Sequence, residues 1–174
     1  MKILAFAASS SSQSINKILA TYAAHLVADG QPEVLDLNDY EMPIYSSDRE
    51  QASGIPEQAK QFYAKIADAD AVIIAFAEHN GSYTAAYKNL FDWTSRIDMK
   101  VYQNKPVLLL ATSPGPGGAA SVLNAASGSA PYFAMDVKAQ LSIPSFFDQF
   151  DMTTGKMQSP EWQDKLLSAI SQLI

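Results

Sequence analysis

Short apolar runs alternate along this chain with segments whose apolar residues recur at helical spacing. The clearest runs are Ala71–Phe76 (AVIIAF) and Pro106–Thr112 (PVLLLAT), and neither contains a polar residue before its last position. Runs of this length and composition are typical of strands that are buried on both faces of a parallel sheet. Parallel strands need crossover connections, which are usually helices. The alternation therefore predicts an α/β fold.

Five strands and five helices are predicted in the order βαβαβαβαβα. The strands are expected at residues 2–7, 33–37, 71–76, 106–112 and 137–143. The helices are expected at about 14–28, 56–69 and 84–97, with a fourth ending near 133 and a last one from 159 to 174, and the polar segment 38–55 is expected to be a long loop. The simplest arrangement is a three-layer α/β/α sandwich with a five-stranded, parallel, flavodoxin-like sheet in the order 2-1-3-4-5. We expect residues 1–174 to form a single domain.

Composition excludes several classes of function. The 12 basic and 18 acidic residues give a net charge of −6, which disfavours binding to nucleic acid or to an anionic membrane surface. The chain has no cysteine and only two histidines, so thiol chemistry is excluded and a zinc site is improbable. The first apolar run turns polar at Ser9, too early for a signal peptide, and no run is long enough to span a bilayer. We therefore expect a cytoplasmic protein without nucleic-acid or membrane partners.

The serine-rich segment Ala7–Asn16 (AASSSSQSIN) follows the first expected strand and leads into the first helix. Ligands of doubly wound sheets bind beyond the carboxyl ends of the strands, so this segment is a candidate site. A helix N-terminus offers unpaired N–H groups and partial positive charge, and hydroxyl groups add donors, so a phosphate can bind without lysine or arginine. The glycine-based GxGxxG and P-loop patterns are absent. The alternative interpretation is a surface linker in which Ser14 caps the helix.

Two further loops follow the third and fourth strands. Asn80 and Gly81 tolerate unusual backbone angles, so they can expose backbone N–H and C=O groups to a planar heterocycle. In Thr112–Gly118 (TSPGPGG), two prolines stiffen the chain and three glycines permit close approach of a ligand. Standing alone, this third segment would be interpreted as a turn.

Together the three loops resemble the NADPH-dependent FMN reductase family, which includes chromate, quinone and azo-dye reductases with a flavodoxin-like fold. The most specific part is Glu78–Ser82 (EHNGS) followed by Tyr87–Trp93 (YKNLFDW), where family members read PEYN-x-S and LKNAIDW. The first loop is similar to the family's GSxRxxSxN at Ser9, Ser14 and Asn16, with Ser11 in place of the arginine. The glycine-rich third loop is similar to that of the family as well.

The resemblance implies that these loops bind FMN. By this resemblance, the FMN phosphate would be bound by Ser9, Ser11, Ser14, Ile15 and Asn16. The flavin ring would be framed, mainly through backbone groups, by Glu78, His79, Asn80 and Gly81. The other edge of the ring would be lined by Ser113, Gly115, Gly117 and Gly118. No metal is implied. His79 is a weak candidate for a role in the chemistry, and the favoured alternative is a flat side chain that packs where the family has tyrosine.

The activity implied by the resemblance is that of an FMN-dependent NAD(P)H oxidoreductase. Electrons would pass from NADPH or NADH through bound FMN to a small-molecule acceptor such as a quinone, an azo compound, a flavin or a metal oxyanion. The alternative is a flavodoxin-like electron carrier without its own NAD(P)H turnover.

The helix after the third strand is expected to serve subunit packing, as it does in the family, giving a homodimer or homotetramer. Its large side chains are Tyr87, Leu90, Phe91 and Trp93. Its charged residues Lys88, Asp92 and Arg96 are spaced for i, i+4 ion pairs on the helix surface.

Overall fold

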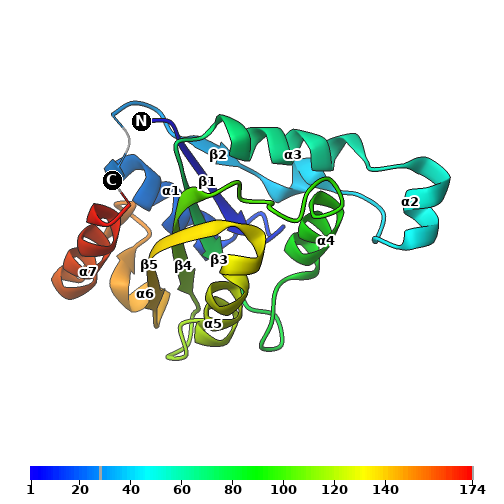
Figure 1. The fold of residues 1–174 in the computed structure, drawn as a ribbon. Coiled ribbons are helices and arrows are strands. Elements are labelled where there is room, and N and C mark those ends of the chain that lie inside the picture. The colour runs from blue at the N-terminus through cyan, green and yellow to red at the C-terminus, as the bar shows by residue number, and fades with distance from the viewer. Residues whose placement is uncertain (28, 174) are drawn as a thin grey trace.

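The computed structural model describes residues 1–27 and 29–173, and within them a five-stranded parallel sheet carries helices on both faces (Figure 1). The strands are β1 (Ile3–Ala8), β2 (Glu33–Leu35), β3 (Ala71–Phe76), β4 (Lys105–Thr112) and β5 (Met135–Ile143). Their order across the sheet is β2-β1-β3-β4-β5. The predicted fold class and strand order are confirmed.

The helices divide between the two faces of the sheet. They are α1 (Ile15–Val27), α2 (Ser47–Ser53), α3 (Glu57–Asp68), α4 (Ala85–Thr94), α5 (Ala120–Ser129), α6 (Phe146–Gln149) and α7 (Pro160–Ser171), with short 3₁₀ helices η1 (Leu37–Tyr40) and η2 (Ala130–Phe133). Helices α1 and α7 pack on one face, and α3, α4 and α5 pack on the other (Figure 1). The expected helix ends at residues 28 and 174 lie outside the described residues.

Successive residues of the central strands enter two separate cores. In β3, Val72 and Ile74 belong to the core under α3–α5, whereas Ile73 and Ala75 belong to the core under α1 and α7. All four are fully buried. This is why the run is continuously apolar rather than alternating: side chains alternate between faces, and helices cover both faces.

Two predictions about the segment after β2 are wrong. The expected loop 38–55 contains most of η1 and all of α2. Helix α2 begins after Ser46, whose hydroxyl accepts a hydrogen bond from the Arg49 N–H, and ends at Gly54, whose φ is 74°. No α2 residue is buried, so the helix leaves no apolar period in the sequence. Strand β2 ends at Leu35 rather than at residue 37, because Asp36 caps η1 through the Asn38 N–H.

The carboxyl-terminal third also departs from the prediction in detail. The fourth expected helix is divided into α5 and η2, with Pro131 near the start of η2. After β5 come helix α6 and a small antiparallel hairpin of β6 (Phe150–Asp151) and β7 (Lys156–Met157), neither of which was predicted. The start of the last helix is confirmed, since the Ser159 hydroxyl accepts a hydrogen bond from the Trp162 N–H.

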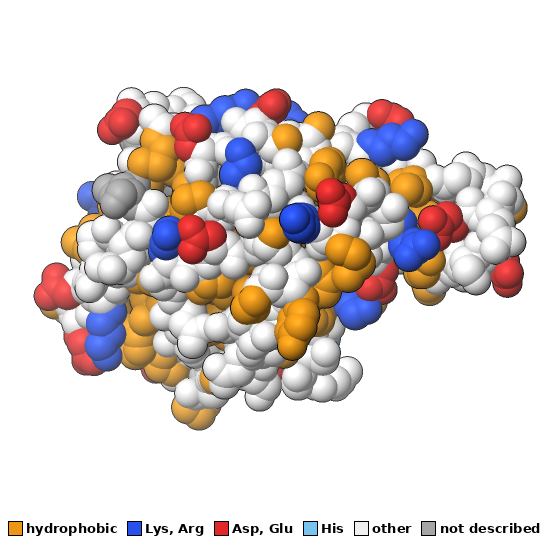
Figure 2. Space-filling model, in the orientation of Figure 1, with side chains coloured by type: hydrophobic (Ala, Val, Ile, Leu, Met, Phe, Trp, Pro, Cys, Tyr) orange, Lys and Arg blue, Asp and Glu red, His pale blue; other side chains and the backbone are white. Residues whose placement is uncertain are grey.

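The large side chains of α4 serve mainly the protein's own core. Tyr87, Leu90 and Trp93 are each at most 3% exposed, so these three side chains pack in the core, and the expected homodimer or homotetramer stays a prediction. Phe91 is half-buried and lines a groove between α4 and α5 together with Phe133. Figure 2 shows hydrophobic side chains among charged ones over α4 and α5.

One of the two ion pairs expected on α4 forms. Lys88 Nζ lies 2.7 Å from Asp92 Oδ1, as predicted. Arg96 instead pairs with Glu50 of α2 at 2.9 Å, so the expected Asp92–Arg96 pair is wrong. The unpredicted helix α2 supplies the competing carboxylate.

Candidate cofactor-binding site

A cleft of about 330 Å³ lies where β1, β3 and β4 end. The first loop lines it with Ser9, Ser11, Gln13, Ser14, Ile15 and Asn16. The second and third loops line it with Ala77, Glu78, His79, Thr112, Ser113 and Pro114, and α6 adds Phe147. The fold therefore brings the three predicted loops together at the point where the crossovers from β1 and β3 lead to opposite sides of the sheet.

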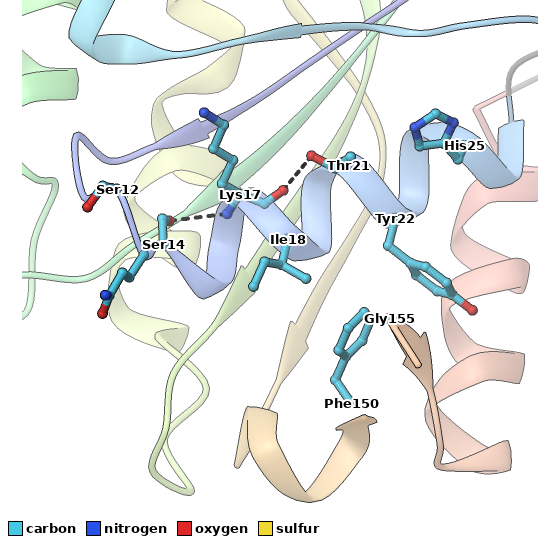
Figure 3. A pocket seen from close by; sticks show the side chains of 10 residues that line it. Ser12, Ser14, Lys17, Ile18, Thr21, Tyr22, His25, Phe150 and Gly155 are labelled. Carbon is cyan, nitrogen blue, oxygen red and sulfur yellow. Dashed lines mark hydrogen bonds between the residues drawn. The ribbon is translucent and has the colours of Figure 1, made fainter. Parts of the chain in front are cut away.

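Three serine hydroxyls of the first loop accept backbone hydrogen bonds and keep their own protons. Ser9 Oγ accepts from the Ser11 N–H at 3.2 Å, and Ser11 Oγ accepts from the Gln13 N–H at 3.2 Å. Ser14 Oγ accepts from the Lys17 N–H at 3.1 Å, the bond drawn at the start of α1 in Figure 3. In the part of the chain that the structure describes, none of these hydroxyls donates. A serine hydroxyl has one proton to give, so all three can donate to an anion.

The start of α1 adds backbone donors to the same place. The Ser14 carbonyl accepts from the N–H groups of Lys17 and Ile18. The N–H groups of Ile15 and Asn16 have no backbone acceptor among residues 1–27 and 29–173. They point out of the helix end, as the first N–H groups of a helix do, and they lie at the positive end of its dipole.

The Asn16 side chain is occupied elsewhere. Its Nδ2 donates to the Thr112 carbonyl at 3.1 Å, and its Oδ1 accepts from the Thr112 N–H at 3.0 Å. Asn16 is 3% exposed and Thr112 is 1% exposed. The two bonds tie the start of α1 to the end of β4, so this amide positions the first loop against the third.

Among the residues that the structure describes, no lysine or arginine lines the cleft. The nearest basic residue in sequence is Lys17, whose Nζ lies 2.5 Å from Asp36 Oδ2. The hydrogen bond from Lys17 and the bond from the Asn38 N–H lower the pKa of Asp36 from its usual 3.8 to about 2. The charge of Lys17 is thus compensated by a carboxylate, and the cleft presents neutral donors to an anion.

The second loop is a tight turn. The N–H groups of His79 and Ser82 donate to each other's carbonyl groups at 3.0 and 3.2 Å. Asn80 and Gly81 between them have φ values of 53° and 76°, as the sequence led us to expect of an Asn-Gly pair. The His79 side chain is exposed at the cleft. Its weak candidacy for a role in the chemistry and the favoured alternative, a flat side chain in the place of the family's tyrosine, both stay predictions.

Glu78 joins the second loop to α5. Its Oε2 accepts a hydrogen bond from the Val122 N–H at 2.9 Å, in the first turn of α5. The residue before that helix, Ala119, has a φ of 56° and makes no side-chain cap. The Glu78 carboxylate therefore caps α5 from a loop that is distant in sequence. Glu78 also lines the cleft, but its Oε2 is already used by this cap.

Of the three glycines of the third loop, only Gly118 is required by packing, since a Cβ at Gly115 or Gly117 would meet no atom within 4 Å. Ser113 lines the cleft, and its hydroxyl donates to the Gly115 carbonyl at 3.0 Å. Gly118 has a φ of 59°, and a Cβ there would collide with Ser142 Oγ of β5. The predicted site residues that do not line the cleft are Asn80, Gly81, Gly115, Gly117 and Gly118.

Phe147 is the main contributor that the sequence analysis missed. It is 53% exposed and follows Ser145, which adopts a left-handed φ of 48°. The Ser145 and Phe146 N–H groups donate to the carbonyls of Gly115 and Ser113, which holds α6 against the third loop. The signal was available, because Phe147 follows the carboxyl end of the fifth strand.

Within the described residues, no cluster of His, Cys, Asp and Glu could hold a metal ion. No described helix combines the length and the apolar character that crossing a membrane requires.

The fold and the cleft define a flavodoxin-like α/β protein with a hydroxyl-lined cleft at the switch point of its sheet. Residues 1–148 match the NADPH-dependent FMN reductase family, and the chain belongs to this family.

Curated relatives carry related names. A 2-hydroxy-1,4-benzoquinone reductase of Burkholderia sp. is 36% identical over 122 residues, covering 69% of this chain and 64% of that protein. An NAD(P)H-dependent FMN reductase of Pseudomonas aeruginosa is 33% identical over 121 residues, with coverage of 69% and 64%. A quinone reductase of Escherichia coli K12 is 32% identical over 97 residues, with coverage of 56% and 49%. The chain thus spans less than two thirds of the length of these relatives.

Solved structures share the fold. FerB, an NAD(P)H:(acceptor) oxidoreductase of Paracoccus denitrificans, superposes with a TM-score of 0.76 at 22% identity, covering 99% of this chain and 94% of that one. A flavodoxin of Pseudomonas aeruginosa superposes with a TM-score of 0.57 at 13% identity, covering 99% of both chains. These likenesses confirm the flavodoxin-like fold.

Proposed function

We propose that this chain binds FMN in the 330 Å³ cleft and acts as an FMN-dependent NAD(P)H oxidoreductase. The observation that supports this most directly is the set of three hydroxyls, Ser9, Ser11 and Ser14, which accept backbone N–H groups and retain their protons. A phosphate monoester has several acceptor oxygens and a charge of about −1.5 to −2 at neutral pH, so it matches these donors and the helix end. When bound, FMN supplies the hydride and electron chemistry.

The residues of the chain would then orient the two ends of the cofactor. Ser9, Ser11, Ser14 and the N–H groups of Ile15 and Asn16 would bind the phosphate. The ring would lie toward Ala77–His79 and Thr112–Pro114, where backbone groups and a proline line the cleft. Phe147 would add an apolar wall that keeps water from one side of the cofactor. In this arrangement Asn16 and Glu78 are positioning residues, because their side chains hold loops rather than ligand.

A small-molecule acceptor would receive the electrons. The names of the relatives favour a quinone over the other expected acceptors, which are an azo compound, a flavin or a metal oxyanion. The donor would be NADPH or NADH. The absence of the family's arginine at Ser11 removes one charge that could select the phosphate of NADPH. The cytoplasmic location and the single-domain organisation stay predictions.

We further propose a homodimer or homotetramer that uses the groove between α4 and α5. Its half-buried aromatic residues Phe91 and Phe133, with the 55% exposed Met99, replace the buried side chains first expected at the interface. Light scattering at several protein concentrations tests this, and a monomer throughout the accessible range would contradict it.

The phosphate assignment is tested with Ser14→Ala. A hydrogen bond to a charged group contributes about 1.5–3 kcal/mol, so the variant should bind FMN about tenfold to a hundredfold more weakly. Ser10→Ala is the matched control, because Ser10 belongs to the same loop but does not line the cleft. Riboflavin, which lacks the phosphate, should bind all three proteins equally. Equal FMN affinity of the Ser14→Ala and Ser10→Ala variants would contradict the assignment.

The enzymatic part is tested on FMN-loaded protein without oxygen. NADPH or NADH should bleach the yellow colour rapidly, and a quinone should then restore it with repeated turnover. Slow bleaching by both nucleotides, with FMN firmly bound, would support the alternative of a flavodoxin-like electron carrier.

A further inference from the structure

The side chain of His79 is exposed at the cleft and has no partner within the protein. Of the two histidines, both of which the structure describes, His79 lines the cleft and His25 does not. The backbone of His79 is fixed by the tight turn, because its N–H and C=O groups both pair with Ser82. Its imidazole nitrogens make no hydrogen bond within residues 1–27 and 29–173. The turn therefore holds this ring at the cleft and leaves both nitrogens available to a bound molecule.

The other side chains that line the cleft are poor sources of a proton. The hydroxyls of Thr112 and Ser113 already donate to backbone carbonyl groups, and the serines of the first loop are assigned to the phosphate. Glu78 caps α5, and carboxyl groups are ordinarily ionised at neutral pH. Imidazole, in contrast, is the side-chain group that ordinarily gains and loses a proton between pH 5 and 8. Among the described residues that line the cleft, a histidine is therefore the one suited to proton transfer.

We propose that His79 is the proton donor when a quinone is reduced in the cleft. This inference rests on the proposed function, because it names a catalytic residue for the acceptor half of that reaction. Reduction of a quinone to a hydroquinone takes two electrons and two protons, that is, one hydride and one further proton. The hydride is cofactor chemistry. The further proton passes from the imidazole to the quinone oxygen that gains negative charge, so that an O–H bond forms as the N–H bond breaks. Because the side chain is exposed, the imidazole then recovers a proton from water.

The place of His79 in the cleft suits a donor to the acceptor. His79 ends the segment Ala77–His79, toward which we place the flavin ring, and a quinone has to lie against that ring to accept a hydride. The serines that we assign to the phosphate belong to a different loop. His79 can therefore reach the acceptor without serving as a ligand of the phosphate.

The first test measures the acceptor step alone, as the reoxidation of FMN-loaded protein that has been reduced with dithionite without oxygen. A quinone takes up protons as it is reduced, whereas ferricyanide takes one electron at a time and no proton. His79→Phe keeps a flat ring but has no proton to donate. It should slow reoxidation by the quinone about a hundredfold, since general acid–base catalysis contributes about 10²–10⁴-fold, and leave reoxidation by ferricyanide almost unchanged. In His79→Ala, added imidazole should restore part of the quinone rate.

His25→Phe is the matched control. His25 lines a separate cavity of about 490 Å³ along the outer face of α1, between this helix and the β6–β7 hairpin (Figure 3). Among the described residues, that cavity shares only Gln13 and Ser14 with the cleft. The control makes the same change of side chain away from the place of the flavin ring, so both reoxidation rates should stay those of wild type.

The second test measures contact with the acceptor without turnover. Hydroquinone, the product, is added without oxygen to oxidised, FMN-loaded protein, and the two imidazole rings are followed by NMR. The variants His79→Phe and His25→Phe assign their signals. The His79 signals should shift and saturate as hydroquinone is added, while the His25 signals stay in place. Unchanged His79 signals at saturating hydroquinone would overturn the inference, because a proton donor has to touch the acceptor.

The outcomes separate this inference from the proposed function. Equal slowing of both acceptors in His79→Phe overturns the inference, because the residue then acts on the cofactor or on access to the cleft. An unchanged quinone rate in His79→Phe, with rapid bleaching of wild type by NADH or NADPH, overturns the inference and leaves the proposed function intact. Slow bleaching of wild type by both nucleotides, together with the expected loss of the quinone rate, supports the inference and overturns only the NAD(P)H part of the proposed function. If FMN does not bind, both fail.

Discussion

The Asn16–Thr112 connection makes a quantitative prediction about stability. Asn16→Ala removes two hydrogen bonds and leaves the N–H and C=O groups of Thr112 without partners at a residue that is 1% exposed. An unsatisfied buried polar group costs about 1–3 kcal/mol, so the two together should lower the free energy of unfolding by about 2–6 kcal/mol. Small domains have only about 5–15 kcal/mol in total, so the loss is large.

Urea unfolding of the flavin-free protein, followed by tryptophan fluorescence, measures this loss. With an m value of about 1–3 kcal/mol/M, the urea concentration at the unfolding midpoint should fall by about 0.7 M or more. Asn38→Ala is the matched control. Asn38 also donates from its side chain to a distant carbonyl, that of Ser10 at 3.0 Å, but it is exposed, so its loss should cost about 0.5 kcal/mol or less. Equal stability of the two variants would refute the reasoning, because water would then be reaching the Thr112 backbone.

Three further predictions address other parts of the molecule. Tyr102→Phe leaves the hydroxyl of the fully buried Tyr87 without its partner at 2.8 Å, which should cost about 1–3 kcal/mol in urea unfolding, whereas adding Tyr87→Phe should recover much of the loss. Because Lys17 lowers the pKa of Asp36 to about 2, the pair stabilises the fold above about pH 4 and loses this effect as the pH falls toward 2; acid titration of stability should be shallower in Asp36→Asn. His79→Tyr changes an exposed side chain, so stability should change by less than about 0.5 kcal/mol and FMN affinity by less than about twofold, and a larger loss of affinity would assign His79 a direct contact with the cofactor.

The sheet and the place of the cleft could be predicted because their signals are local. A run such as Ala71–Phe76 is apolar because both of its faces are buried, so six consecutive apolar residues indicate the strand. The carboxyl ends of neighbouring parallel strands must meet at one edge, so three loops distant in sequence could be placed together in advance. The turn at Asn80 and Gly81 followed from the same kind of local rule, since both residues adopt positive φ.

The functions of single side chains could not be predicted because they depend on distant partners. Asn16 meets a backbone group 96 residues away, and Glu78 meets one 44 residues away. No sequence pattern near either residue indicates those partners. Helix α2 was not predicted for a related reason. None of its residues is buried, so its apolar residues do not recur at helical spacing.

These distant contacts explain how polar loops can form a defined cleft. Asn16 ties the first loop to the end of β4, and Glu78 ties the second loop to α5. The Ser145 N–H ties α6 to the third loop through the Gly115 carbonyl. Each connection uses a buried or half-buried polar group whose partner is lost if the loops separate, so the loops keep their spacing without a ligand. The serine hydroxyls are therefore held in position before a ligand binds. Binding then loses little conformational entropy of the loops, and that loss is what usually weakens binding to polar loops.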